Sequence, residues 1–256
     1  MADYLRSELL TGLGFKHGFS LRKGGVSAPP FDSLNLGRGV GDSPAAVDEN
    51  YARLAGAIGY APERLYEVSQ VHGRAVAVAD GAEPAASFRF QEADAVVACV
   101  QGIAVGVRTA DCVAVLVVHP GSGSVSAVHS GWRGTALDVV GEAVRQLCRL
   151  SEARAEALAA AVFPHIGRAA FEVGDEVAEQ LARAVPDPGR VVSRAEARPH
   201  VDLGAAVSQQ LVRAGLLPDR VDLVSGCTFS DPHRFFSHRR DGAASGRHLA
   251  VVVAGC

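Results

Sequence analysis

The 256-residue sequence lacks the features that mark secreted, membrane and nucleic-acid-binding proteins. Its five cysteines form no CxxC pair and are too few for a disulfide framework, which favours a reducing compartment. Residues 1–14 have neither the charged n-region nor the apolar h-region of a signal peptide, and no apolar run approaches the roughly 20 residues that span a bilayer. The net charge of −3 gives no reason to expect nucleic acid or an anionic membrane as a partner. We therefore expect a cytoplasmic protein that binds neither.

Common catalytic and nucleotide-binding motifs are also missing. No GxGxxG follows a strand pattern and no GxxxxGK[ST] occurs, so ordinary nucleotide-binding loops are absent. Neither the HExxH of zinc proteases nor the HxE…PCxxC of zinc deaminases is present. The chain therefore carries neither of these two zinc-site signatures.

Hydrophobic periodicity predicts a mixed α/β fold. After a loop-rich stretch at 15–41, helices are expected at 44–58, 135–150, 174–185 and 203–214. Strands are expected at 65–71, 75–79, 93–99, 103–108, 113–119, 125–129, 158–162 and 248–253, the first two paired around a turn at His72, and a polar loop at 81–91. Because these elements show no regular βαβ period, the sequence predicts one mixed α/β domain over residues 1–256 instead of a doubly wound sheet.

Three potential metal ligands stand at the edges of predicted strands: His72, Cys112 and His129. A catalytic zinc commonly takes three such ligands and keeps its fourth position open, and thiolate with imidazole favours zinc or copper over magnesium or calcium. The same residues also suit a cysteine nucleophile activated by histidine. Taken singly, each is more often a packing or surface residue. The residues alone leave these readings open.

Arginine-containing turns indicate anion binding. The turn at 130–135 joins a strand to a helix, where free N–H groups attract an anion and Arg133 adds a fixed cation. Arg22 lies in a turn that either clamps an anionic group or is merely solvated. Near the C-terminus, Arg239 and Arg240 either contact a ring of the substrate or, for Arg240 with Asp241, form a structural ion pair. The segment 200–202 is a candidate support for a metal ligand.

Seven motifs occur in an order that resembles one family, the YfiH-like laccase-domain proteins. This family is also called the polyphenol oxidase or purine nucleoside phosphorylase family, and its bacterial members include peptidoglycan editing factors. The resemblance covers residues 15–253. Its motifs are SLRKGGVS (20–27), FDSLNL (31–36), QVHG (70–73), ADA (93–95), TADC (109–112), VHSGWRG (128–134) and FFSHRRD (235–241).

The resemblance implies an α/β/β/α layered sandwich with zinc bound by His72, Cys112 and His129. It also implies phosphorolysis of adenosine, inosine and methylthioadenosine, together with adenosine deamination. The chain departs from the family pattern at 163–167, where a Gly-Pro-Cys-like stretch is usual. It departs again at His238, where the family has an aromatic residue. These departures concern a loop near the pocket and a stacking partner for a base.

The hypothesis assigns a role to each candidate residue. Cys112 is essential for the metal, Asp111 carries protons beside it, and Arg133 acts on the phosphate. The substrate-binding candidates are Arg22 for phosphate, Asn35 for the nucleoside, and Arg239 and Arg240. The expected partners are a purine nucleoside and phosphate, and the expected state is a monomer or weak homodimer.

Three rival functions compete with this hypothesis. A multicopper oxidase needs several His-x-His pairs and a blue-copper site that often has an axial Met. The nine histidines form no such pair and the only methionine is Met1, so copper is the weaker cofactor prediction and laccase chemistry is disfavoured. A Cys/His hydrolase acting on a peptidoglycan precursor, with Cys112 as nucleophile, remains the main alternative. A non-enzymatic protein with structural zinc needs four ligands, and only three good ones are present.

Overall fold

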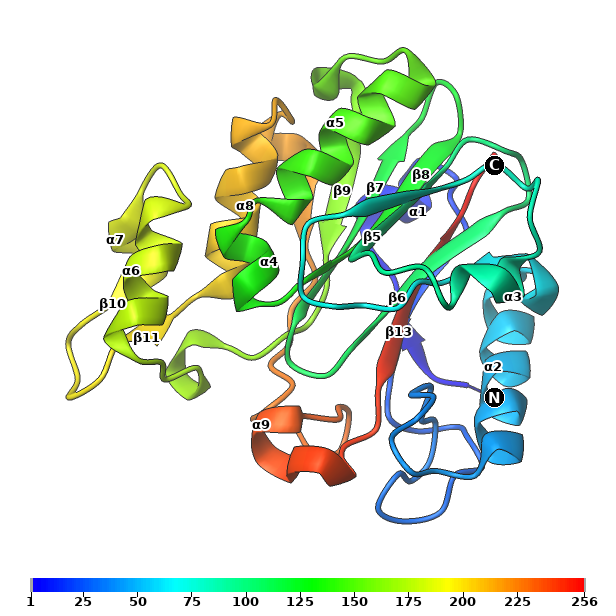
Figure 1. The fold of residues 1–256 in the computed structure, drawn as a ribbon, viewed down its shortest axis with the longest axis horizontal. Coiled ribbons are helices and arrows are strands. Elements are labelled where there is room, and N and C mark those ends of the chain that lie inside the picture. The colour runs from blue at the N-terminus through cyan, green and yellow to red at the C-terminus, as the bar shows by residue number, and fades with distance from the viewer. Residues whose placement is uncertain (1, 256) are drawn as a thin grey trace.

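Two β-sheets packed face to face form the centre of the computed structural model, which describes residues 2–255 (Figure 1). The six-stranded sheet has the order β12 (Val221–Leu223), β9 (Ala159–Val162), β7 (Val113–His119), β8 (Ser124–Ser130), β5 (Ala95–Ala98), β4 (Val76–Ala79). The five-stranded sheet has the order β1 (Tyr4–Leu5), β2 (His17–Ser20), β13 (His248–Val253), β6 (Ala104–Thr109), β3 (Leu65–Tyr66). A small third sheet pairs β10 (Val192–Ser193) with β11 (His200–Val201).

Helices cover the outer face of each large sheet. The α-helices are α1 (Glu8–Gly12), α2 (Pro44–Ile58), α3 (Ala85–Phe88), α4 (Trp132–Ala136), α5 (Val139–Ser151), α6 (Asp175–Arg183), α7 (Pro188–Val191), α8 (Leu203–Arg213) and α9 (His238–Asp241). Short 3-10 helices are η1 (Pro62–Arg64), η2 (Ala155–Ala157), η3 (Arg168–Ala170), η4 (Pro218–Arg220) and η5 (Gly242–Ala244). Among the described residues, no helix has the length and apolar character needed to cross a membrane.

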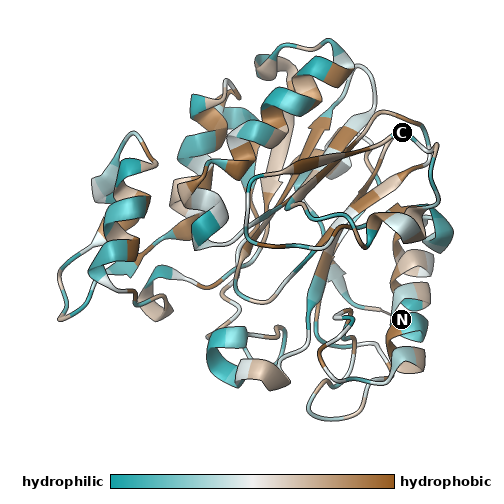
Figure 2. Ribbon diagram, viewed as in Figure 1, coloured by the Kyte–Doolittle hydropathy of each residue, from teal (hydrophilic) through white to brown (hydrophobic). Residues whose placement is uncertain are grey.

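Side-chain alternation along the strands builds the layers. In β7, Leu116 points into the core between the sheets, while Val115 and Val117 face the core beneath α5 and α8. Both faces of this strand are buried, which explains its continuous run of valine and leucine. On the other side, α2 packs Tyr51 and other apolar side chains onto the outer face of the five-stranded sheet. Figure 2 shows the hydrophobic residues concentrated along the strands. The α/β/β/α sandwich expected from the family resemblance is confirmed.

The expected strand pair around His72 is wrong. β3 is only two residues long and pairs with β6 in one sheet, whereas β4 pairs with β5 in the other. The chain therefore crosses between the sheets over residues 67–75, and this crossing segment forms only an isolated bridge from Ser69 to Glu92. The segment 110–112 makes a second crossing, from β6 to β7. The family motifs QVHG and TADC both lie on crossing segments.

Two predicted boundaries also differ. The single helix expected at 135–150 is split into α4 and α5, because Asp138 adopts a left-handed conformation with φ of 60°. A left-handed residue interrupts the helical hydrogen-bond ladder, and hydrophobic spacing alone does not reveal it. The loop expected at 81–91 contains the short helix α3. By contrast, α2 runs from Pro44 to Ile58 and ends at Gly59 in the left-handed region, as its cap signals predict.

Candidate active site

His72, Cys112 and His129 meet at one place. Their ligand atoms all lie within 4.8 Å of one another. The Sγ of Cys112 is 4.0 Å from Nε2 of His72, and the two imidazole rings stand edge to face with centroids 4.9 Å apart. His72 is exposed, Cys112 is partly buried and His129 is buried, so the group opens to solvent on the His72 side.

Strand register and one glycine bring the group together. In the β7–β8 ladder, Val113 lies opposite Ser130, so Cys112 falls beside the end of the strand that carries His129. Gly131 follows at once, and a Cβ there would come within 2.9 Å of Cys112 Sγ and 3.0 Å of the His72 ring. Only glycine therefore leaves room for the thiol and the imidazole to converge.

Asp94 supports the side chain of His129 and the backbone of His72. Its buried carboxylate accepts a hydrogen bond from His129 Nδ1 at 2.7 Å, which leaves Nε2 free to face the site. The same carboxylate accepts the backbone N–H groups of Val71, His72 and Gly73 at 3.2, 3.0 and 2.6 Å. The sequence assigned no role to Asp94, although it lies within the ADA motif at the start of an apolar strand. The structure instead places residues 200–202, the predicted support, in β11 and at the N-cap of α8.

The electrostatics of the group favour a thiolate. Burial alone would raise the pKa of Cys112, but the imidazoles of His129 and His72 outweigh it and lower the value to about 6. Burial would likewise lower the pKa of His129, but the Cys112 thiolate and Asp94 raise it to about 9. Without metal, the neutral-pH state is therefore a thiolate beside an imidazolium. Thiolate is the form that binds metal and the form that attacks as a nucleophile.

The donor set fits zinc. With Zn–N about 2.1 Å and Zn–S about 2.3 Å, tetrahedral ligand atoms lie about 3.5 Å apart. The 4.0 Å between Cys112 Sγ and His72 Nε2 is close to this spacing, and the ligand atoms of all three residues lie within 4.8 Å of one another. One thiolate, two imidazoles and a carboxylate behind one of them match the usual ligands and outer support of a catalytic zinc.

A cavity of about 650 Å³ opens over the three ligands. Besides His72, Cys112 and His129, its wall contains Trp132 and Phe171, and it is strongly basic. Six arginines line it: Arg38, Arg89, Arg108, Arg133, Arg239 and Arg247. The one acidic residue in the lining, Asp111, already accepts hydrogen bonds from the Thr228 hydroxyl and from the Arg239 backbone N–H, both at 2.6 Å. The cavity is therefore suited to an anionic ligand with a flat ring.

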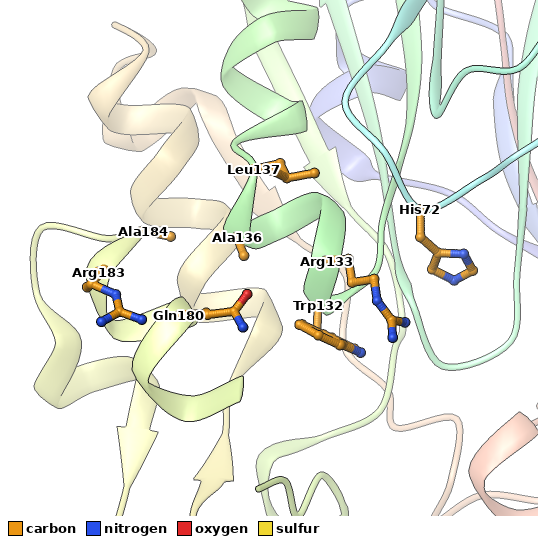
Figure 3. A pocket seen from close by; sticks show the side chains of 8 residues that line it. All are labelled: His72, Trp132, Arg133, Ala136, Leu137, Gln180, Arg183 and Ala184. Atoms are coloured by element: carbon orange, nitrogen blue, oxygen red, sulfur yellow. The ribbon is translucent and has the colours of Figure 1, made fainter. Parts of the chain in front are cut away.

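A second cavity of about 450 Å³ adjoins the first (Figure 3). Both cavities share His72, Trp132 and Arg133, so these three residues form the wall between them. Gln180 and Arg183 of α6 line the far side. The guanidinium of Arg133 stacks over the Trp132 ring at 4.3 Å.

The structure divides the other predicted residues into two groups. Arg133 and Arg239 line the large cavity, and Arg239 stacks over Phe171 at 5.3 Å. His238, the departure from the family pattern, lines it as well. The other departure is the segment 163–167, of which Ile166 lines the cavity.

Arg22, Asn35 and Arg240 lie outside the cavity lining. Arg22 donates to the Asp32 carboxylate at 3.1 Å and lies over the Phe236 ring. Buried Asn35 donates to Asp42 and accepts the N–H groups of Gly37 and Arg247. The guanidinium of Arg240 pairs with Asp241 and donates to the carbonyls of Thr228, Phe229 and Phe235. All three side chains thus hold loops together around the cavity.

A layered α/β sandwich with a His-Cys-His group at its basic cavity defines the class of protein. The family model described as multi-copper polyphenol oxidoreductase laccase matches residues 16–255, and the chain belongs to this family. The solved structure of the hypothetical protein YfiH from Bacillus licheniformis is similar, with a TM-score of 0.88, 27% identity and coverage of 93% of this chain and 92% of that one. The solved structure of YlmD from Geobacillus stearothermophilus is also similar, with a TM-score of 0.85, 29% identity and coverage of 93% of this chain and 91% of that one. The resemblance to YfiH-like proteins is confirmed.

Curated relatives carry the name purine nucleoside phosphorylase. One from Mycobacterium tuberculosis is 39% identical over 231 residues, which is 90% of this chain and 88% of the relative. One from Deinococcus radiodurans is 38% identical over 240 residues, or 94% of this chain and 89% of the relative. The identity and coverage support an enzyme of that kind.

Proposed function

We propose that the protein is a zinc-dependent purine nucleoside phosphorylase acting on adenosine, inosine and methylthioadenosine, with adenosine deamination as a second activity. The observation that carries the proposal is the convergence of His72, Cys112 and His129 under a basic cavity lined by Trp132 and Phe171. Zinc held by the three ligands would supply Lewis-acid chemistry at this cavity. The proposed location is the cytoplasm, in keeping with the four unpaired cysteines among residues 2–255.

The chain's own residues account for substrate binding. Trp132 with Arg133, and Phe171 with Arg239, are two stacked pairs on the cavity wall that offer flat surfaces to a purine. The guanidiniums of Arg133 and Arg239 also provide donors for phosphate. Asp111, with both oxygens accepting hydrogen bonds from the protein, holds the segment of Arg239 beside Cys112. We assign Asp111 this positioning role in addition to the proton transfer expected from its sequence position.

Phosphorolysis and deamination have different products. In phosphorolysis a phosphate oxygen bonds to the ribose C1′ as the bond from C1′ to the purine N9 breaks, and the purine takes up a proton. The products are a free base and ribose 1-phosphate, or 5-methylthioribose 1-phosphate when the substrate is methylthioadenosine. In deamination water adds at C6 and ammonia leaves, which gives inosine from adenosine. In phosphorolysis, fixed arginines stabilise the negative charge of the attacking phosphate in the transition state.

Purified protein with measured metal content should be assayed against adenosine, inosine and methylthioadenosine, with and without phosphate. The proposal predicts bound zinc, base release that requires phosphate, and phosphate-independent inosine formation from adenosine. Removal of zinc by a chelator should stop both reactions, and added zinc should restore them. Base release that persists without phosphate would contradict the phosphorylase assignment.

The laccase description of the family fits this chain poorly. Multicopper oxidation requires several copper sites. Within residues 2–255, the structure gathers a single group of at least three metal-ligating side chains, His72, Cys112 and His129. Zinc is therefore the proposed metal and copper the weaker candidate.

The low pKa of Cys112 favours a second candidate function. A thiolate beside the His129 imidazolium is the arrangement of a cysteine hydrolase, and its proposed substrate is a peptidoglycan precursor. Alkylation of Cys112 in metal-free protein decides between the two. If metal-free protein hydrolyses the peptidoglycan precursor and alkylation of Cys112 abolishes this hydrolysis, the hydrolase is correct. If metal-free protein is inactive and added zinc restores phosphate-dependent base release, the phosphorylase is correct.

A further inference from the structure

Arg108 is a fixed cation in the wall of the large cavity. It is the penultimate residue of β6, and its side chain is only 18% exposed. The Gln70 side chain holds its backbone on both sides, donating to Arg108 O at 2.7 Å and accepting from Arg108 N at 2.8 Å. The position of this arginine is therefore set by the protein and does not depend on a ligand.

A buried carboxylate anchors the Arg108 guanidinium from behind. Glu67 is 1% exposed, and its Oε1 lies 3.5 Å from Arg108 Nε while accepting the Tyr51 hydroxyl at 2.9 Å. Arg108 also donates to the Val68 carbonyl at 3.1 Å. A guanidinium has five N–H donors, so donors remain for the cavity side. Burying a carboxylate is unfavourable unless it is paired; Oε1 of Glu67 faces this arginine, whereas Oε2 has no hydrogen-bond partner among the described residues.

Arg247 supplies a second fixed cation next to the first. It immediately precedes β13, and the next residue, His248, lies opposite Thr109 in the β13–β6 ladder. The two arginines therefore come from the adjoining ends of neighbouring strands. Arg247 uses Nη1 to donate to the carbonyls of Ser245 and Gly246, which leaves Nε and Nη2 available.

The charges that act on Arg247 agree with this strand register. Burial lowers the pKa of Arg247, the charges of Cys112 and Asp111 raise it, and the charge of Arg108 lowers it. The two guanidiniums thus interact electrostatically, Arg247 also interacts with the metal ligand Cys112, and all three residues line the same cavity. The carboxylate in reach, Asp111, is already bonded to Thr228 and Arg239.

Both guanidiniums line a cavity that has six arginines and one carboxylate, and such a surplus of fixed N–H donors favours the binding of an anion. We propose that Arg108 and Arg247 form the oxyanion-binding pair of the site and that Glu67 is a positioning residue for Arg108. The ligand is a tetrahedral phosphate oxyanion beside Cys112. The inference rests on the proposed function for the reaction that uses this phosphate. It adds Arg108 and Arg247 to Arg133 and Arg239 as donors for that phosphate, in place of Arg22.

Equilibrium binding of inorganic phosphate to the zinc-loaded protein, followed by 31P NMR, tests the pair without any turnover. Loss of one charged hydrogen-bonding partner should weaken binding about 10- to 100-fold in Arg108→Gln and in Arg247→Gln. Arg108→Lys keeps the charge and should retain part of the affinity. Arg53→Gln is the matched control, because Arg53 is an exposed arginine of α2 paired with Glu49. Circular dichroism and zinc content verify that each variant is folded.

Adenosine 5′-monophosphate, titrated in parallel, identifies the source of the phosphate. If only inorganic phosphate depends on Arg108, the pair binds a co-substrate. If the nucleotide depends on it, the pair binds a phosphate ester of the substrate. Both results support the pair. Folded Arg108→Gln protein that binds both ligands like wild type overturns it, as does wild type that binds neither.

Steady-state kinetics distinguish a positioning role of Glu67 from a folding defect. They also test the phosphate-binding pair separately from the proposed function. Glu67→Gln should raise the KM for phosphate while the KM for the nucleoside stays unchanged, which a merely structural defect would not produce. Unchanged KM for phosphate in folded Glu67→Gln protein refutes the positioning role. If wild type binds phosphate through Arg108 but performs no phosphorolysis, the pair stands and the phosphorylase proposal fails.

Discussion

Replacement of Asp94 by Asn should weaken zinc binding in a protein that still folds. The Oδ1 atom of Asp94 accepts from His129 Nδ1 and from the His72 N–H, and Oδ2 accepts from the Val71 and Gly73 N–H groups. An amide has one acceptor oxygen, so either orientation turns its NH2 group toward donors. A buried donor left unpaired costs about 1–3 kcal/mol. Loss of an outer carboxylate on a ligating histidine weakens metal binding about 10- to 100-fold.

Competition with a chromogenic chelator measures zinc affinity, and urea unfolding of the metal-free protein measures stability. Asp80→Asn is the matched control, because Asp80 is exposed and its carboxylate accepts only the Ala82 N–H, at 2.9 Å. We expect this control to behave like wild type in both assays. Asp94→Asn protein with wild-type zinc affinity would refute the assignment of Asp94 as the support of His129.

Three further residues give separate predictions. In metal-free protein, alkylation of Cys112 by iodoacetamide should be half-maximal near pH 6, and a midpoint near the ordinary thiol value would contradict the electrostatic account. The folded-state pKa of Cys112 lies below the ordinary thiol value, so the stability contributed by the thiolate is lost as the pH falls through about 6. Urea unfolding of wild type and of Cys112→Ser over this pH range measures the loss. Gly131→Ala should reduce zinc binding in a folded protein, because the added Cβ meets Cys112 Sγ at 2.9 Å; equal zinc binding would show that the thiol can move aside. Arg240→Gln should lower the free energy of unfolding by about 1–3 kcal/mol, since it leaves several backbone carbonyls without their donor, and an unchanged value would count against its structural role.

Much of the fold follows from apolar periodicity. The long strands β7 and β8 and the helices α2 and α8 lie where hydrophobic spacing and cap residues predict them. The assignment of strands to two different sheets is not predictable in this way. β6 and β7 are neighbours in sequence but belong to different sheets, because the crossing at 110–112 depends on tertiary packing. The left-handed turn at Asp138 is equally invisible to periodicity.

Part of the candidate site can also be predicted from the pattern of apolar runs in the sequence. His72, Cys112 and His129 are polar residues beside apolar runs; in the structure, His72 and Cys112 lie on the two crossing segments and His129 lies near the end of β8. Asp94 and Arg108 escape this reasoning because each resembles an ordinary strand-end charge in the sequence. Only the partners of Asp94 and the buried anchor of Arg108 reveal their roles, and those partners lie at least 21 residues away.

Phosphate-dependent release of a purine base by wild type and by Cys112→Ala, each with its zinc content determined, tests the central claim most directly. The account predicts that wild type carries zinc and converts inosine and phosphate to hypoxanthine and ribose 1-phosphate. It predicts that folded Cys112→Ala protein has neither zinc nor activity. Full phosphorolysis by metal-free Cys112→Ala protein would contradict it.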